Sequence, residues 1–571
     1  MLCRGPDDAG VWISDDGRVA LGHRRLAILD PSSRSAQPMR SDSGRYVISY
    51  NGEIYNFREL RRRLEALGEH FRSDGDTEVL LALYARKGAD MVHELRGMFA
   101  LAIWDEARRG LLLARDHFGI KPLYYADDGR SIMVASEVKA LLAAGGIDTG
   151  VEPAGHAGFF LWGAVPEPFT LYRGIRALPA GSTMWIDSGG ADRPRVYASV
   201  GRLLAEGERD ARELPAARAD AELRTALLES VQRHLVADVD VGLFLSAGRD
   251  STTLAALASE LRGQLRTVTL GFAEYRGTHH DETPLAEMAA RHYGTDHRTL
   301  WITRDEFHRE RDRLLDRMDQ PTTDGVNSYF VARAAAETGL KVALSGLGGD
   351  ELFGGYPEFQ ELPRLVGALG RVPGARAVGR AMRALVAPLI ATMTSPKYAS
   401  VAEYGTTIAD AYLLRRALFM PWELANLLGD ELAEAGWSAL AARDTLADTA
   451  SVPRDTFHKV SALVTAHYMR NQLLRDTDWA SMSHALEVRT PLVDWALWRR
   501  AAAIYTAGAP LGKAALARAA RPALPPEIAQ RRKTGFSIPT REWMHDEGVP
   551  QHGATDRGLR GWARYVYARM T

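Results

Sequence analysis

The stretch DVDVGLFLSAGRDSTTLAALASEL, residues 238–261, decides the fold of this chain. Its apolar first part predicts a buried strand over 238–245, and its last part predicts a helix over 251–261. The turn between them consists mainly of small residues, whose backbone N–H groups and following helix N-terminus would form an anion cradle. No Gly-Lys-Ser/Thr follows, so this is not a Walker A loop. It suits a pyrophosphate group, or it is an ordinary strand-to-helix turn of an α/β protein.

Strands and helices alternate on both sides of this stretch. Further strands are predicted over 267–272, 297–302 and 340–345, and helices over 221–236, 283–293, 304–318 and 326–338. Unbroken apolar strands that alternate with helices indicate a doubly wound parallel sheet covered on both faces. Residues 360–530 are predicted to be mostly helical.

A second glycine-rich loop, within LKVALSGLGGDELFGGY at 340–356, follows the last of these strands. Its glycines would let a ligand approach the backbone closely. Asp350 and Glu351 beside a phosphate cradle suit Mg²⁺, which prefers one or two carboxylates plus phosphate oxygens and water. The alternative is a glycine-rich turn with a helix-capping Asp. Two such loops at the carboxyl ends of parallel strands favour a ligand site.

The first 200 residues show a different pattern of predicted secondary structure. Short strands are predicted over 45–50, 98–105, 110–116 and 131–136, and helices over 57–68 and 77–88, which indicates an α+β layer architecture. Asn51-Gly52 predicts a turn after a strand, because Asn-Gly is a strong hairpin signal. Asp76 is predicted to cap the helix that follows it.

Composition excludes several classes of protein. Of 571 residues, 46% are hydrophobic and 25% charged, which excludes a disordered chain and a collagen-like chain. The net charge of −1 gives no bulk attraction to nucleic acid or to an anionic membrane. No run of about 18 uncharged apolar residues occurs, so no membrane span is expected. The single cysteine, Cys3, excludes an internal disulfide, and we expect a cytoplasmic protein.

Many short motifs together resemble the glutamine-dependent asparagine synthetase family, over about residues 1–545. In the first half these are RGPDDAG (4–10), HRRLAILD (23–30), QPM (37–39), NGEIYNFREL (51–60), GDTE (75–78), GMFALAIWD (97–105) and RDHFGIKPLYY (115–125). In the second half they are LSAGRDS (245–251), SGLGGDELFGGY (345–356), SMSHALEVRTPLVD (481–494) and RRKTGFSIP (531–539). Each motif alone is weak evidence for the family, but this many motifs in this order are highly specific for it.

The resemblance implies two domains and a two-stage reaction. It implies an Ntn-hydrolase-like αββα glutaminase domain over 1–200, a linker over 201–220, an ATP-pyrophosphatase domain with a helical C-terminal part over 221–547, and a polar tail over 548–571. Glutamine would release ammonia in the first domain. ATP, with Mg²⁺, would convert aspartate to β-aspartyl-AMP in the second, and ammonia would displace AMP to give asparagine. The implied partners are these small molecules, with neither nucleic acid nor membrane, and the family often forms homodimers.

The resemblance also assigns the glutamine site. Arg25 matches the position that holds the glutamine carboxylate, as guanidinium chemistry suits. Asn51 and Gly52 match the pair that stabilises the oxyanion. Glu53 and Asp76 match positions that grip the amino and amide ends of glutamine.

For the synthetase reaction, the resemblance implies an ATP site formed by Leu245, Ser246, Gly248, Asp250, Ser251, Leu270, Ser345 and Gly346. Leu245 and Leu270 would lie near the adenine, and Asp250 and Asp350 would share the magnesium ion. Lys513 matches a lysine that stabilises charge as the adenylate forms or is attacked. The alternative for Lys513 is a solvated surface lysine.

One departure from the family concerns the nitrogen donor. The family nucleophile is a cysteine directly after the initiator methionine, with its own α-amino group as base. Here Leu2 stands at that place, and Cys3 has different neighbours and no free amine, so we do not predict Cys3 as the nucleophile. One interpretation is that the start codon is misassigned. The other is that glutaminase activity is lost, in which case free ammonia is the nitrogen donor. We favour the missing start, because the rest of the glutamine site persists.

Two further departures concern the acceptor. Leu347 replaces a glutamate that takes part in forming the adenylate, while Ala247 and Arg249 replace the usual Gly and Leu of the phosphate loop. These changes argue against aspartate as the acceptor more strongly than against the ATP-dependent reaction. A ligase or cyclase of the same fold that acts on another carboxylate is therefore an alternative. A catalytically inactive binding or regulatory homologue is a second alternative, of a different class.

Overall fold

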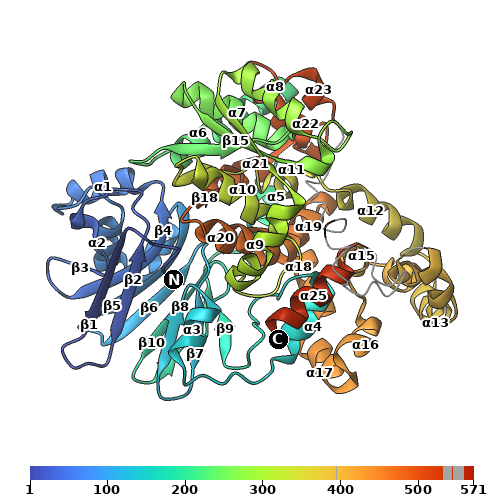
Figure 1. The fold of residues 1–571 in the computed structure, drawn as a ribbon, viewed down its shortest axis with the longest axis horizontal. Coiled ribbons are helices and arrows are strands. Elements are labelled where there is room, and N and C mark those ends of the chain that lie inside the picture. The colour runs from blue at the N-terminus through green and yellow to red at the C-terminus, as the bar shows by residue number, and fades with distance from the viewer. Residues whose placement is uncertain (394, 532–542, 544–557) are drawn as a thin grey trace.

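The computed structural model describes residues 1–393, 395–531, 543 and 558–571 (Figure 1). Two domains lie side by side, the N-terminal one in blue to cyan and the C-terminal one in green to red. Within the described residues, no helix is long and apolar enough to cross a bilayer.

The N-terminal domain contains two layers of sheet between helices. The larger layer is an antiparallel seven-stranded sheet. Its strands, in order, are β11 (Gly190–Ala191), β10 (Ser182–Asp187), β6 (Gly110–Arg115), β5 (Gly97–Asp105), β4 (Tyr46–Ile54) and β3 (Met39–Arg40), with β12 (Arg195–Val196) also paired to β10. The second layer contains the hairpin of β1 (Asp8–Ile13) and β2 (Ala20–Arg25), and the sheet of β8 (Ile132–Ala135), β7 (Tyr124–Asp127) and β9 (Ile175–Ala177).

Helices cover the outer faces of both layers. The apolar stripes of α1 (Phe57–Glu65) and α2 (Thr77–Lys87) pack on the large sheet, where Leu60 and Leu80 share a core with Ile48. On the other side, α3 (Val138–Ala144) packs on β7 and β8. The result is the predicted Ntn-like αββα sandwich.

The C-terminal domain is built on a parallel five-stranded sheet with the order β16-β15-β14-β17-β18. The strands are β14 (Val241–Phe244), β15 (Arg266–Phe272), β16 (Asp296–Ile302), β17 (Val342–Leu344) and β18 (Glu487–Arg489). Helices α6 (Ala216–His234), α7 (Arg249–Arg262) and α8 (Thr283–Tyr293) share one core, and α9 (Arg304–Arg317) and α10 (Val326–Glu337) share another. The predicted doubly wound sheet is therefore confirmed.

A mostly helical region follows this sheet. It contains α11 (Gly349–Phe353), α12 (Glu358–Leu369), α13 (Ala375–Met393), α14 (Val401–Tyr404), α15 (Ile408–Arg416), α16 (Ala425–Leu428), α17 (Asp430–Leu440), α18 (Ala442–Ser451), α19 (Thr456–Leu463), a π-helix (Val464–Leu474), α20 (Arg475–Met482), α21 (Trp495–Ala502), α22 (Lys513–Arg518) and α23 (Pro526–Ala529). Helix α17 packs against α4 (Pro153–Trp162), which joins this region to the end of the N-terminal domain. A small three-stranded sheet has β19 (Ile504–Thr506) in its centre, paired with β13 (Arg212–Glu213) on one side and with β20 (Ala509–Pro510) on the other.

The structure corrects the predicted turn at Asn51-Gly52. Both residues lie inside β4, where they face Ala100 and Phe99 of β5. A Cβ at Gly52 would lie 2.1 Å from the carbonyl oxygen of Met98, and the Gly52 φ of +153° is one that L residues rarely adopt. Glycine is needed here for close packing of two strands, not for a hairpin.

Two segments expected to lack regular structure contain packed helices. In the stretch predicted as a linker, α5 (Val200–Arg209) buries Leu203 and Leu204 and packs against α21. In the stretch predicted as a polar tail, α25 (Arg560–Met570) buries Trp562 and Val566, and it lies beside α4 (Figure 1). These helices bury apolar side chains that are interspersed with arginines, so composition alone concealed them.

Candidate functional site

The loops after β14 and β17 lie in direct contact at the carboxyl end of the parallel sheet. Strands β14 and β17 are neighbours. A Cβ built on Gly346 would lie 3.0 Å from the backbone nitrogen of Ser251, and one on Gly349 would lie 2.7 Å from Cγ of Asp250. The glycines therefore let two polar loops pack backbone to backbone, as the parallel-sheet prediction required.

Hydroxyl groups organise the first loop. The Ser246 and Ser251 hydroxyls lie 2.9 Å apart, and the Ser246 N–H donates to Ser251 Oγ at 3.1 Å. The Gly248 N–H donates to Ser246 Oγ at 3.2 Å, and Gly248 is the N-cap of α7. This 14-residue helix therefore directs its N-terminus at the loop, which favours an anion there.

Lys513 joins the acidic residues of the two loops. Its Nζ lies 2.5 Å from both carboxylate oxygens of Asp250 and 2.7 Å from Oδ1 of Asp350. Burial disfavours charge on Lys513, but the two carboxylates outweigh burial and raise its pKa above the ordinary value. The Lys513 side chain is 15% exposed, so the alternative of a solvated surface lysine does not hold.

Gly355 belongs to the same cluster, although it was predicted only as one glycine of a permissive loop. A Cβ on Gly355 would lie 1.8 Å from Oδ1 of Asp350 and 2.5 Å from Cε of Lys513. Any side chain there would displace the ion pair.

The acidic pair fits a nucleotide-bound magnesium ion better than a protein-only metal site. Among the described residues, no group of three or more His, Cys, Asp or Glu side chains is arranged to hold a metal. Mg²⁺ commonly takes one or two carboxylates and completes its shell with phosphate oxygens and water. Asp250 and Asp350, beside a loop suited to phosphate, match that donor set.

The remaining residues predicted for ATP surround these loops. Leu245 and Leu270 are both buried, the first directly after β14 and the second in β15. The carbonyl of Leu245 accepts a hydrogen bond from the Thr269 hydroxyl at 2.5 Å. The Ser345 N–H donates to the carbonyl of Arg489 in β18 at 2.8 Å, which fixes the start of the second loop.

The two unusual residues of the loops lie in different surroundings. Leu347 is half-buried and packs against the core formed by α6 and α7. Arg249, the first residue of α7, donates from Nη2 to the carbonyl of Arg531 at 3.0 Å. Its Nε is buried without a hydrogen-bond partner in the described part of the chain.

The acid next to Asp350, Glu351, accepts a hydrogen bond from the Tyr356 hydroxyl at 2.6 Å.

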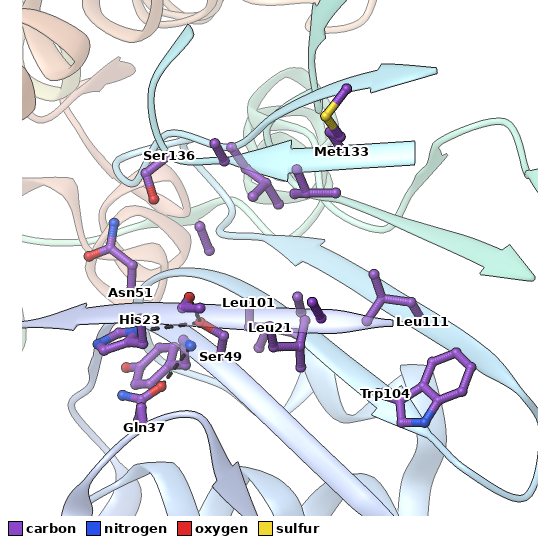
Figure 2. A pocket seen from close by; sticks show the side chains of 18 of the residues that line it. Leu21, His23, Gln37, Ser49, Asn51, Leu101, Trp104, Leu111, Met133 and Ser136 are labelled. Carbon is purple, nitrogen blue, oxygen red and sulfur yellow. Dashed lines mark hydrogen bonds between the residues drawn. The ribbon is translucent and has the colours of Figure 1, made fainter. Parts of the chain in front are cut away.

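A second candidate site lies in the N-terminal domain. A cavity of about 1540 Å³ is lined by residues of β1, β2, β8 and the large sheet, and its lining includes all five residues predicted for the glutamine site: Arg25, Asn51, Gly52, Glu53 and Asp76. Figure 2 shows Met133 and Ser136 on one side of this cavity, with His23 and Asn51 on the other.

The donor groups in this cavity are held by their neighbours. The Arg25 guanidinium donates to the carbonyls of Leu29, Asp30 and Ser32 at 3.1, 2.5 and 3.0 Å, which fixes its orientation. Asn51 Nδ2 is buried and has no hydrogen-bond partner among the described residues. This N–H donor is therefore available to stabilise an oxyanion.

Asp76 precedes α2 as predicted, but its side chain does not cap the helix. One carboxylate oxygen accepts from the Tyr50 hydroxyl and from the Ile54 N–H, each at 2.9 Å. Burial raises the pKa of Asp76 to about 6. The carboxylate is therefore directed toward β4 and the cavity.

Cys3, the only cysteine of the sequence, is not among the described residues that line the cavity. Its sulfur accepts a hydrogen bond from Nη1 of Arg317 in α9 at 3.2 Å. Cys3 therefore contacts the C-terminal domain and lies outside the described lining of the cavity.

Comparison with known proteins matches both halves of the chain. The model described as "Glutamine amidotransferase domain" matches residues 1–198, and the model described as "Asparagine synthase" matches residues 222–555. The chain is 35% identical over 575 residues to a Mycobacterium tuberculosis (strain H37Rv) protein provisionally named an asparagine synthetase [glutamine-hydrolyzing]. That match covers 95% of this chain and 83% of the relative.

Two further relatives carry different names. "Asparagine synthetase [glutamine-hydrolyzing] 1" of Bacillus subtilis (strain 168) is 32% identical over 556 residues, which cover 96% of this chain and 84% of the relative. "Amidase chry2" of Gibberella zeae is 30% identical over 380 residues, which cover 62% of this chain and 54% of the relative. The identity extends through both domains, and the chain belongs to the asparagine synthase family.

Proposed function

We propose that this chain converts aspartate to asparagine with ATP, through a β-aspartyl-AMP intermediate. The observation that carries the proposal is the ion pair of Lys513 with Asp250 and Asp350, where the two glycine-rich loops meet. This arrangement sets one cation and two acidic groups beside a phosphate-binding loop. Adenylation needs all three groups. The phosphates of ATP must be bound, and the negative charge that develops as pyrophosphate leaves must be stabilised in the same place.

In the first step, an oxygen of the aspartate side-chain carboxylate bonds to the α-phosphorus of ATP as the bond to pyrophosphate breaks. The N–H and hydroxyl groups of the loop at Ser246–Ser251 bind the departing pyrophosphate. Asp250 and Asp350 would hold Mg²⁺, which neutralises phosphate charge when bound. The Lys513 ammonium stabilises the negative charge that develops at the reacting oxygens.

In the second step, the nitrogen of ammonia attacks the acyl carbon and loses its extra proton to solvent. The bond from that carbon to the phosphate oxygen then breaks, and AMP departs with the electron pair. Adenylation makes this step feasible because AMP is a better leaving group than an oxide. Enclosure of the ammonia would keep it unprotonated and away from water.

The nitrogen source is the second part of the proposal. Arg25, Asn51, Glu53 and Asp76 line one cavity and provide groups for both ends of glutamine and for an oxyanion. None of the described residues that line this cavity is a cysteine. We therefore infer that glutamine is the ligand of this cavity, and we expect the 571-residue chain, tested by itself, to use free ammonia as its nitrogen donor.

The test compares nitrogen donors with the full chain, ATP, Mg²⁺ and L-aspartate. With ammonium chloride, we expect asparagine, AMP and pyrophosphate in equal amounts, and no ADP. With glutamine alone, we expect a rate at least about 100-fold lower, since a missing nucleophile costs several powers of ten. Formation of ADP would contradict adenylation, and equal rates with both donors would contradict the ammonia assignment.

Two observations favour an alternative acceptor. Leu347 places an apolar side chain in the loop where the family resemblance implies a glutamate, and one relative is named an amidase. A ligase that acts on another carboxylate would form AMP with that compound and not with aspartate. A panel of amino acids, sugar acids and peptides in the same assay distinguishes the two functions. An inactive homologue would form AMP with none and would not bind ATP.

A further inference from the structure

A buried arginine of the C-terminal domain contacts Glu53, which lines the cavity predicted to bind the nitrogen donor glutamine (the donor cavity). Arg489, in β18, is completely buried. Its Nε donates to Oε1 of Glu487 at 2.8 Å, and its Nη1 donates to the carbonyls of His234 and Val236 at 3.0 and 2.6 Å. These contacts fix the plane of the guanidinium within the C-terminal domain.

The other side of this guanidinium faces Glu53. Nη2 of Arg489 lies 3.3 Å from Oε1 of Glu53, which lines the donor cavity. The same nitrogen is buried and makes no hydrogen bond to the described residues, so its contact with Glu53 is ionic. Met482 and Glu487, also of the C-terminal domain, line the same cavity. Part of the donor site is therefore supplied across the domain interface.

We propose that Arg489 is a positioning residue for the nitrogen-donor site, which orients the Glu53 carboxylate and favours its ionised form, so that Glu53 can bind the α-amino group of glutamine. This inference rests on the proposed binding of glutamine. Arg489 itself does not contact the donor and acts only through Glu53. The backbone carbonyl of Arg489 binds the Ser345 N–H in the nucleotide loop, so β18 connects the donor site to the nucleotide site.

The charge state of Glu53 depends on this contact. Burial raises the pKa of Glu53 well above its ordinary value, and Glu487 and Asp76 raise it further, whereas Arg489 and Lys121 lower it. Loss of the Arg489 guanidinium would therefore raise the pKa of Glu53 further, and Glu53 would be protonated over a wider pH range. A protonated Glu53 cannot form an ion pair with the ammonium group of glutamine. The groups that face Glu53 are Arg489, Glu487, Asp76, Lys121, Tyr50 and Tyr55.

The experiment measures binding of L-glutamine to the full chain by calorimetry between pH 6 and pH 9. For Arg489→Met we expect affinity at pH 7 to fall about 30-fold or more, as for removal of one member of a buried charge pair. We also expect the affinity to recover partly as the pH rises, with its midpoint shifted upward relative to the original chain. Arg489→Lys retains the charge and should restore much of the affinity and the original midpoint.

Arg475→Met is the matched control, because Arg475 also crosses the interface, with Nη1 2.7 Å from the carbonyl oxygen of Val165, and does not line the cavity. Its glutamine affinity and midpoint should be unchanged. Unchanged binding in Arg489→Met, or equal weakening in both variants without a shift in midpoint, would overturn the inference. If Arg489→Met does not fold, Glu53→Gln decides: it should weaken binding and reduce the pH dependence of binding, and original binding there overturns the inference. Failure of the original chain to bind glutamine would instead refute the proposed donor function.

Discussion

Replacing Asp350 with alanine is expected to abolish adenylate formation while the fold stays intact. The Asp350 carboxylate contacts Lys513 at 2.7 Å and is predicted to share the magnesium ion with Asp250. Removal of one group that stabilises transition-state charge typically costs 10²–10³-fold. Loss of a magnesium ligand adds to this, so we expect carboxylate-dependent ATP–pyrophosphate exchange to fall about 10³-fold or more. The isosteric variant Asp350→Asn should lose nearly as much, because its amide has no charge.

The control for this prediction is Asp448→Ala, which removes an exposed carboxylate from α18. Its exchange rate should equal that of the original chain. Circular dichroism and thermal unfolding should show that both Asp350 variants are folded. An Asp350→Ala variant with normal exchange would show that Asp350 does not take part in adenylation.

The second large effect is expected for Lys513→Met. Lys513 is the cation between Asp250 and Asp350, and methionine retains most of its apolar volume without the charge. We expect exchange to fall by about 10²–10³-fold, because the developing negative charge loses its stabilising donor. Binding of Mg·ATP, measured by calorimetry, should change by only a few-fold, because the two carboxylates and the phosphate loop remain.

Lys513→Arg should recover part of the activity, since it retains the charge but presents it in a different geometry. Lys87→Met, at a half-exposed lysine paired with Glu94, is the matched control and should behave as the original chain. If Lys513→Met lost Mg·ATP binding and exchange to the same extent, Lys513 would be a ground-state binding residue and not one that stabilises the reaction's charge.

The C-terminal domain was largely predictable from sequence because its signals are local and consistent. Helix α8 begins and ends at the predicted residues, with Pro284 at its start and Gly294 in a left-handed conformation at its end. The approach of the loops at Ser246 and Ser345 followed from the rule that parallel strands end at one edge of a sheet. Such predictions need no information on distant contacts.

The errors occurred where tertiary contacts override local signals. Asn51-Gly52 has the composition of a hairpin turn, yet pairing with β5 extends β4 through it. Strand β18 has only three residues within a helical region, so no periodicity reveals it. The contact of Arg489 with Glu53 joins residues far apart in the chain, and only the arrangement of the two domains brings them together.

The most direct test of the central claim is isotope exchange between ATP and pyrophosphate, because it reports reversible adenylation without any nitrogen donor. The assay contains the full chain, Mg²⁺, ATP, labelled pyrophosphate and L-aspartate. We predict that label enters ATP only when aspartate is present, and that removal of Mg²⁺ with a chelator stops it. Absence of exchange with aspartate and with every other carboxylate tested would contradict the assignment of the two loops to a magnesium-dependent adenylation site.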